Sequence, residues 1–139
     1  MSSLFANDVS ANKDFAFKRA FRFNFGSLVA KEEIGDPEEY RAVYEKYSIL
    51  KKGDIVINGL NLNYDLKSMR VACAPSAGII TSAYIICRPR DGVDYRYFTY
   101  LFKAMDSMKM FHGMGTGIRL TLSFRELRAL KLPYPPLAE

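Results

Sequence analysis

The sequence predicts a single α+β domain in which a mixed sheet packs against a few helices. Strand-like apolar runs and amphipathic helical stripes both occur, but they do not alternate regularly as they would in a doubly wound fold. The hydrophobic content is 49% over 139 residues, which is sufficient for one real core. No internal repeat divides the chain. We therefore expect one α+β domain with long functional loops.

The N-terminal residues differ from the rest of the chain in having no clear pattern. Residues 1–14 are polar, and we expect a loose N-terminal segment there, followed by a domain of residues 15–139. Aromatic and basic residues alternate over positions 15–23, which favours a strand or turn packed on one face. The N-terminus lacks a basic-then-apolar signal pattern, and no apolar run reaches the length of a membrane span. We expect a cytoplasmic protein without a membrane partner.

Three helices are expected from their capping signals. Asp36 followed by Pro37 marks the start of the first helix. Asp94 caps a second helix that runs to about Phe111, and Ser123, with a glutamate three residues later, caps a short third helix. Apolar residues at helical spacing predict the buried sides. The expected buried residues are Tyr40, Val43, Tyr44 and Tyr47 in the first helix, and Tyr97, Phe98, Leu101, Phe102, Met105 and Met108 in the second.

Short apolar runs predict the strands. Ile55–Ile57 follows a turn and is apolar throughout, residues 69–74 form a second strand, and residues 78–88 form a third, long strand. In the C-terminal part, residues 118–122 and 130–134 each predict a further strand. Because helices and strands are mixed in this way, the polar loops between them are the candidate functional segments.

Few residues are arranged like catalytic or metal-binding groups. His112 is the single histidine, so neither a zinc site of the usual composition nor a Ser-His-Asp triad is expected. Neither Asp54 nor Asp65 is followed by the Glu-x-Lys sequence that many nucleases use for metal and base. Cys73 and Cys87 lie in apolar runs and are expected to be buried free thiols. We expect a protein that is not an enzyme.

Two features near the end of the second helix each allow two interpretations. The glycine-rich segment 113–117 lacks the lysine of a P-loop and precedes a strand. It is either a turn that permits close backbone packing or a place where a phosphate backbone can approach. His112 is either a polar residue near a helix C-terminus or a phosphate or base contact.

Positive charge predominates outside an acidic middle segment. The net charge is +5, although residues 32–54 hold seven acids against four Lys or Arg. Residues 1–31 hold five cations against two acids, and residues 55–139 hold eleven against six. This distribution suits a polyanionic partner such as DNA, RNA or a phospholipid surface.

A polar and basic set of side chains indicates recognition of double-stranded DNA. Asn can make paired contacts to adenine, and Arg or Lys to guanine, in the major groove. The loop at residues 58–68 is rich in Asn, but such a loop also suits turns, and each Arg also suits a solvated face or a surface ion pair. The candidate DNA-binding residues are Lys18, Arg19, Arg22, Asn58, Asn61, Asn63, Tyr64, Lys67, Arg70, Ser82, Tyr84, Thr116 and Arg119.

Five segments, in their order and spacing, resemble the target recognition domain of the specificity (S) subunit of type I restriction-modification systems. They are residues 51–58 (KKGDIVIN), 78–84 (GIITSAY), 97–111, 117–120 (GIRL) and 132–139 (LPYPPLAE). The resemblance covers roughly residues 24–139 and implies a mixed, mainly antiparallel curved sheet with a few packed helices. In this family Pro-Pro-Leu-x-Glu leads into a spacer helix, so the domain is expected to end at the start of a missing spacer helix.

The resemblance implies a non-catalytic subunit, or a half or fragment of one, that reads one half of a bipartite DNA site. Such a subunit directs a methyltransferase (M) subunit and an endonuclease, or restriction (R), subunit to that site. S-adenosylmethionine, ATP and Mg²⁺ are expected only in those partner subunits, and no cofactor is expected in this chain. A second recognition domain or self-association would complete the bipartite site.

Two other functions stay open. The chain could be a protein-interaction module or antagonist that binds the methyltransferase subunit without reading DNA. A stand-alone nuclease is the third hypothesis, and metal-dependent cleavage by the pure chain would support it.

Overall fold

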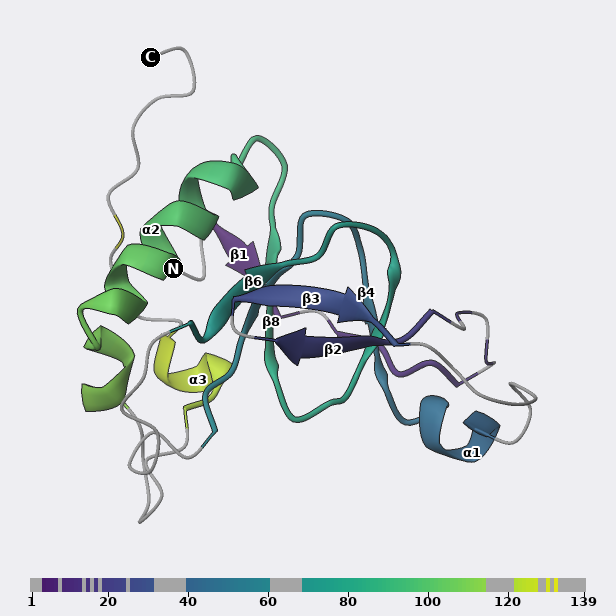
Figure 1. Cartoon of the computed structure of the whole chain (residues 1–139). Helices are drawn as coiled ribbons and strands as arrows, with labels where there is room; N and C mark the ends of the chain where they lie inside the picture. The colour runs from purple at the N-terminus through teal and green to yellow at the C-terminus, as the bar shows by residue number, and fades with distance from the viewer. Residues whose placement is uncertain are drawn as a thin grey trace.

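A four-stranded sheet forms the centre of the fold, and all its neighbouring strands are antiparallel. Its order is β1 (Phe5–Ala6), β8 (Ile85–Pro89), β5 (Ile55–Ile57) and β6 (Val71–Cys73). Two further antiparallel pairs join β2 (Phe21–Asn24) to β3 (Ser27–Ala30) and β4 (Ser48–Leu50) to β7 (Gly78–Ile80). The computed structural model in Figure 1 describes residues 4–7, 9–13, 15, 17, 19–24, 26–31, 40–60, 69–114, 122–127, 130 and 132.

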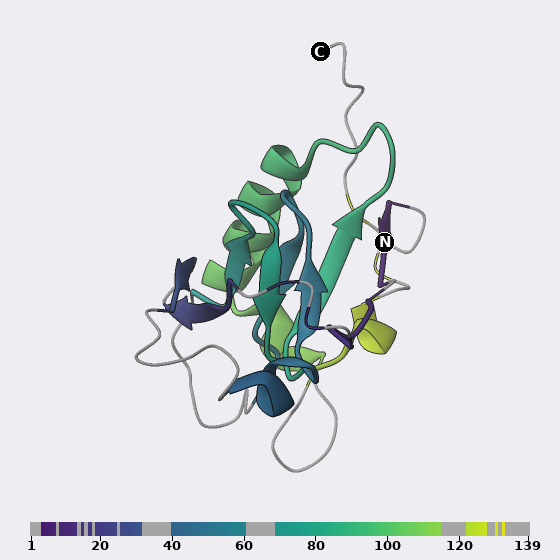
Figure 2. The ribbon, with the colours of Figure 1, turned by 90° about the vertical axis from the view of Figure 1, so that its right-hand side faces the viewer.

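The central strand β5 is buried on both faces, which explains its uninterrupted apolar sequence. Ile55 and Ile57 belong to the core under helix α2 (Tyr95–Ser107), whereas Val56 belongs to a second core under the β2–β3 hairpin. Successive side chains of a strand point to opposite faces of the sheet. Figure 2 shows the hairpin on one side of the sheet and the short helix α3 (Phe124–Leu127) on the other.

Helix α2 begins where the sequence predicts and ends earlier than predicted. The Asp94 side chain caps it by accepting a hydrogen bond from the Arg96 N–H at 3.0 Å. The helix ends at Ser107, and Lys109 adopts a left-handed φ of 58° before a 3₁₀ turn, η2 (Met110–Gly113). Phe98, Phe102 and Met105 are buried as predicted. The prediction for Met108 is wrong, since this side chain lies beyond the helix end and is 67% exposed.

The N-terminal segment is part of the core, so the prediction of a loose segment over residues 1–14 is wrong for the residues described there. Phe5 is fully buried in the edge strand β1, and its ring lies edge-on to Phe98 at 5.2 Å. Asn12 is also buried, and its side-chain amide donates to the carbonyls of Phe17 and Tyr44. A polar sequence is compatible with this position because Asn12 satisfies backbone groups that would otherwise lack partners.

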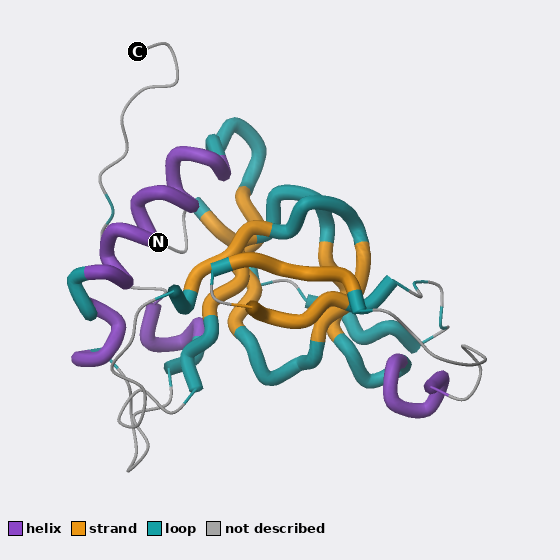
Figure 3. Tube along the Cα trace, in the orientation of Figure 1, coloured by secondary structure: helices purple, strands orange, loops and turns teal. Residues whose placement is uncertain are grey.

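Residues 78–88 form two strands instead of the single long strand that was predicted. β7 pairs with β4, and β8 pairs with β1 and β5, so the chain changes partner between them. Residues 81–84 form the turn at which this change occurs, as Figure 3 shows. Apolarity alone did not reveal the break, because both strands are buried and both sequences are therefore hydrophobic.

The first helix is shorter in the described residues than its sequence stripe predicts. Helix α1 (Arg41–Tyr44) is a single turn, and the predicted start at Asp36 lies outside the described residues. Tyr44 is buried against Phe15 and Ile79, and its ring lies 5.0 Å from that of Tyr47. The prediction for Val43 is wrong, since it is 53% exposed. One helical turn can bury only one side of its residues.

The third helix has the predicted cap. The Ser123 N–H donates to a carboxylate oxygen of Glu126 at 3.0 Å, which is the reciprocal bond of a capping box. Of the two C-terminal strands that were predicted, at 118–122 and 130–134, the structure describes three residues only, Leu122, Leu130 and Leu132. The two predictions therefore lie largely outside the described residues.

An ion pair between the buried Asp54 and the half-buried Arg88 joins the start of β5 to β8. Asp54 is 1% exposed, and its carboxylate accepts hydrogen bonds from the Arg88 guanidinium at 2.9 to 3.3 Å. The same carboxylate accepts the Lys51 N–H at 2.9 Å, which closes the turn before β5. Asp54 therefore has a structural role at the end of the sheet opposite Asn58.

The fold class agrees with the sequence prediction at the level of its architecture. The fold is α+β, its strand pairs are mostly antiparallel, and few helices cover the sheet. An isolated bridge between Ala20 and Ile79 is parallel. Across the part of the chain that the structure describes, no helix has the length and apolarity needed to cross a bilayer.

Candidate nucleic-acid interface

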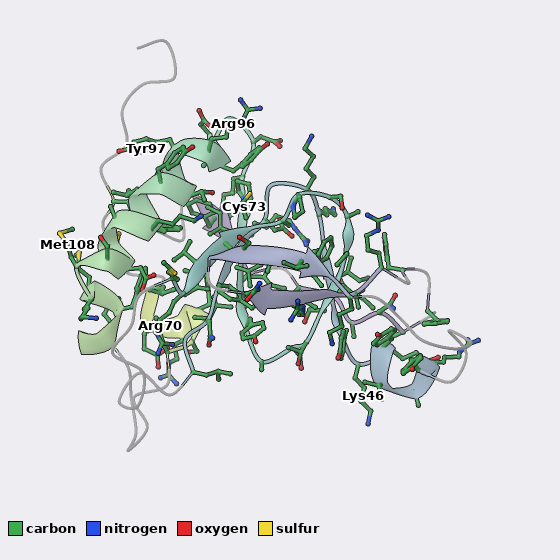
Figure 4. All side chains as sticks on the ribbon, in the orientation of Figure 1. Lys46, Arg70, Cys73, Arg96, Tyr97 and Met108 are labelled. Carbon is green, nitrogen blue, oxygen red and sulfur yellow. The ribbon has the colours of Figure 1, made fainter. Side chains whose placement is uncertain are left out.

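Three of the residues predicted from the sequence meet at one end of the central sheet. β5 ends at Ile57, and its register places Ile57 opposite the first residue of both β6 and β8. Because both neighbours run antiparallel to β5, Asn58 lies beside Arg70 and Tyr84, the residues that precede those strands. The Asn58 N–H donates to the Arg70 carbonyl at 2.8 Å. Figure 4 labels Arg70 at this end of the molecule.

Arg70 has a different environment from the one expected of a DNA-contacting residue. It is 3% exposed, and its guanidinium donates to the backbone carbonyls of Asn58 and Leu60, both at 2.9 Å. A buried guanidinium needs acceptors to offset the loss of water, and the carbonyls at the end of β5 provide them. The expectation of a DNA contact for Arg70 is therefore corrected, because the side chain supports the loop from inside.

Two other segments hold the same loop. The Asp106 carboxylate of α2 accepts the Arg70 N–H at 2.7 Å, and the Leu122 N–H donates to the Gly59 carbonyl at 2.7 Å. A Cβ on Gly59 would lie 2.6 Å from the Leu122 carbonyl oxygen, so only glycine allows this approach. We call residues 58–60, with Arg70 and Asp106, the loop base. It fixes the chain on both sides of residues 61–68.

The side chain of Asn58 forms a turn within the loop base. Its Oδ1 accepts the Leu60 N–H at 3.1 Å, and the residue is half-buried. This is the turn-making alternative that the Asn-rich sequence allowed. Asn58 therefore shapes the start of the polar loop.

The turn between β7 and β8 is linked to the hairpin by an aromatic contact. Ser82 is exposed at the tip of this turn, and Tyr84 is half-buried. The Tyr84 ring lies 5.5 Å from the ring of Phe23 on β2. This contact places the hairpin next to the end of the sheet that carries the loop base.

The outer side of the β2–β3 hairpin is polar and positively charged. Phe21 and Phe23 point toward the core, so Arg22 and Asn24 point outward, and strand pairing places Val29 and Ser27 beside them. The hairpin face is the set of outward residues Arg22, Asn24, Ser27, Val29 and Lys31. Residues 19–31 include three cations and no acid, so this face carries net positive charge.

Arg19 precedes the hairpin and is exposed at the other end of β7. Its carbonyl accepts the Ile79 N–H at 2.9 Å, which ties the approach of β2 to β7. A Cβ on Gly78 would lie 2.5 Å from the Phe21 ring and 2.6 Å from the Arg19 carbonyl oxygen, so this close crossing requires glycine. The structure therefore places Arg19 beside Gly78 and Ile79 of β7.

A cavity of about 390 Å³ lies between the hairpin tip and α2, next to the loop base. Its lining consists of Gly26, Ser27, Met69, Val71, Lys103, Asp106 and Ser107. The Lys103 ammonium donates to the Gly26 carbonyl at 3.1 Å and so joins α2 to the hairpin. The cavity lining therefore combines one ammonium, two hydroxyl groups and the Asp106 carboxylate with apolar side chains.

The remaining predicted site residues cannot be placed. Lys18, Asn61, Asn63, Tyr64, Lys67, Thr116 and Arg119 lie outside the described residues. Of those that are described, the structure brings Asn58, Arg70, Ser82 and Tyr84 to one end of the sheet, and it places Arg22 on the adjoining hairpin.

Two residues of this site were missed from the sequence. Asp106 follows Met105 in an apolar helical stripe, and an acid beside a buried position was a signal that it serves a buried partner. Lys103 gave no comparable signal, because exposed lysines are common on helices.

Cys73 and Cys87 are free thiols, and Cys87 is fully buried. Burial raises the pKa of Cys73 and, more strongly, that of Cys87, so both thiols stay protonated near neutral pH. Among the described residues, no group of three or more His, Cys, Asp or Glu side chains is placed to hold a metal ion.

No protein-family model matches the chain, and a search of curated proteins finds no match.

Proposed function

We propose that this chain adopts the target-recognition-domain fold and reads double-stranded DNA as the specificity subunit, or a half of it, of a type I restriction-modification enzyme. The observation that carries the proposal is the meeting of the hairpin face and the loop base at one end of the sheet. The hairpin face offers cations to phosphates, and the loop base holds both flanks of a polar loop. The resemblance of five ordered segments to that family supports the same function.

The two parts would contribute differently to binding. Exposed cations such as Arg22 would neutralise phosphates, which adds affinity without sequence information. Side chains of residues 61–68, including Asn61 and Asn63, would read base edges. A loop held at both flanks loses less conformational entropy on binding, so the rigid loop base favours specific contacts.

Catalysis would belong to partner subunits. A methyltransferase subunit would bind S-adenosylmethionine, and a restriction subunit would use ATP and Mg²⁺. The chain described here would locate the site in the cytoplasm of the host cell and position those partners on it.

A salt-dependent binding measurement tests the phosphate contacts. For a random 30-base-pair duplex, Arg22→Ala should weaken binding about 3- to 10-fold at low salt and reduce the salt slope by about one. Arg96→Ala removes an exposed cation from α2 and serves as the matched control, with little change expected. Equal losses in both variants, or no duplex binding by the wild-type chain, would contradict the proposal.

Selection from a randomised duplex pool tests the sequence reading. The wild-type chain should enrich a short motif, whereas a chain in which residues 61–68 are replaced by a Gly-Ser segment of equal length should bind without enriching it. Enrichment of the same motif by both chains would show that this loop does not read bases. Binding of a methyltransferase subunit without any duplex binding would favour the alternative of a pure interaction module.

A further inference from the structure

The outer side of α2 carries an apolar stripe that no other described segment covers. Tyr100 is 76% exposed and Met108 is 67% exposed, and Ala104 between them is exposed as well. Tyr100 and Ala104 are spaced by four on one side of the helix, and Met108 follows at the same spacing just after the helix ends. Met110, just beyond the helix, extends the stripe and is 45% exposed. Large apolar side chains gathered in this way are typical of an interaction surface.

Cations border the same side of the helix and outnumber the exposed acid there, which is the cap residue Asp94 at the helix start. Arg96, Lys103 and Lys109 are all exposed. The single acid of α2 is Asp106, and its carboxylate points inward to the Arg70 N–H. The fold thus turns the one acid within this helix toward the loop base, and three exposed cations outnumber the exposed cap residue Asp94.

We propose that this outer side, the α2 stripe, is a protein-docking surface that binds an amphipathic helix whose apolar side is flanked by Asp or Glu. The partner's apolar side would pack on Tyr100 and Met108, and its carboxylates would pair with the cations. Methionine and tyrosine suit such a surface, since one adapts its shape and the other presents a large area with few rotatable bonds. Figure 4 labels Arg96 near the start of α2 and Met108 near its end.

Charge and apolarity together distinguish this partner from DNA. A phosphate backbone would match the cations but would offer no apolar surface to Tyr100, Ala104 and Met108. From Arg96 to Met108 the stripe extends about 18 Å, which corresponds to about three turns of a packed partner helix. The inference does not depend on the DNA-binding function proposed above, because its apolar residues Tyr100, Ala104 and Met108 belong to neither the hairpin face nor the loop base.

Binding of designed peptides tests the proposal. The probe is a synthetic 18-residue helix with leucines on one side and glutamates beside them, and its control carries lysines in place of the glutamates. The wild-type chain should bind the glutamate peptide at least 10-fold more tightly than the lysine peptide, as measured by isothermal titration calorimetry. Tyr100→Ala and Arg96→Glu should each weaken that binding at least 10-fold, and Arg96→Glu should improve binding of the lysine peptide.

These substitutions are chosen so that the fold is retained. Alanine has a higher helix propensity than tyrosine, and a glutamate in the first turn interacts favourably with the helix dipole. Arg22→Ala is the matched control and should leave peptide binding unchanged while it weakens duplex binding. The two proposals can therefore fail separately.

Several results would overturn the docking proposal. One is equal affinity for the two peptides, and another is binding of neither peptide. A third is binding of the glutamate peptide that neither Tyr100→Ala nor Arg96→Glu weakens. Loss of duplex binding in Arg96→Glu without peptide binding would assign the stripe to DNA. Concentration-dependent dimerisation that Tyr100→Ala abolishes, again without peptide binding, would assign it to a second copy of this chain.

Discussion

The loop base and the hairpin face meet at the same end of the sheet, but they use their arginines in opposite ways. Arg70 is buried, and its guanidinium is directed to the carbonyls of Asn58 and Leu60. Arg22 is exposed on the outer side of β2, where it lies opposite Val29 in the hairpin. A buried guanidinium stabilises the protein that surrounds it, whereas an exposed one can exchange water for a phosphate. The comparison shows that depth in the fold decides which role an arginine has.

The largest effect is expected from removing the buried arginine. Arg70→Ala leaves two carbonyls at the end of β5 without this donor, and it should lower the free energy of unfolding by about 2–5 kcal/mol. Urea denaturation followed by circular dichroism measures the change. Arg70→Lys keeps the charge but not the planar fork and should be intermediate. Stability equal to that of the wild type would mean that Arg70 does not hold the loop.

The next effect is expected at the glycine of the loop base. In Gly59→Ala the new Cβ would meet the Leu122 carbonyl oxygen at 2.6 Å, so the backbone of one segment must move. We expect a loss of about 1–3 kcal/mol in the free energy of unfolding, together with faster hydrogen exchange at the Leu122 N–H. Unchanged exchange at that amide would argue against the close contact.

A smaller effect is expected from the turn at Asn58. Asn58→Ala removes the oxygen that accepts the Leu60 N–H and should cost about 0.5–1.5 kcal/mol of unfolding free energy. Asn58→Asp retains an acceptor at the same place and should keep most of the stability. If both variants lost the same stability, the amide group itself, and not the turn, would be the important feature.

The smallest effect on stability is expected on the hairpin face. Arg22→Ala should change the free energy of unfolding by no more than about 0.5 kcal/mol, because the side chain is exposed on the outer side of β2. Thermal denaturation measures this. A large loss of unfolding free energy would show that Arg22 also supports the fold, and its contrast with Arg70 would then disappear.

Much of the fold follows from local patterns. Ile55–Ile57, the Asp94 cap and the Ser123 capping box were predicted and are confirmed, since each depends on neighbouring residues only. The break between β7 and β8 was not predicted, because a continuous apolar sequence does not reveal a change of pairing partner. The burial of Phe5 was missed for a similar reason, since an edge strand of two residues has no detectable period.

The candidate site was predicted less completely than the fold. Arg22, Asn58, Ser82 and Tyr84 were named from residue type, and the structure places them near one end of the sheet. Arg70 was named for the wrong reason, and Asp106 was not named at all. The guanidinium of Arg70 bonds to the carbonyls of Asn58 and Leu60, and its N–H bonds to Asp106, which is 36 residues away in the sequence. No local pattern reveals contacts between segments that are so far apart.

The sequence by itself determined the α+β class, the buried central strand, two helix caps and the excess of positive charge. These properties depend on composition and on spacing within a few residues. The tertiary structure alone decided which polar groups are buried and which are exposed. Sheet register brings Asn58 next to Arg70 and turns Asp106 inward, and this leaves Arg22 and the α2 stripe at the surface. Burial of a polar group costs desolvation free energy unless the group finds a hydrogen-bond partner. Because such partners come from distant segments, no short stretch of sequence shows which polar residues are buried.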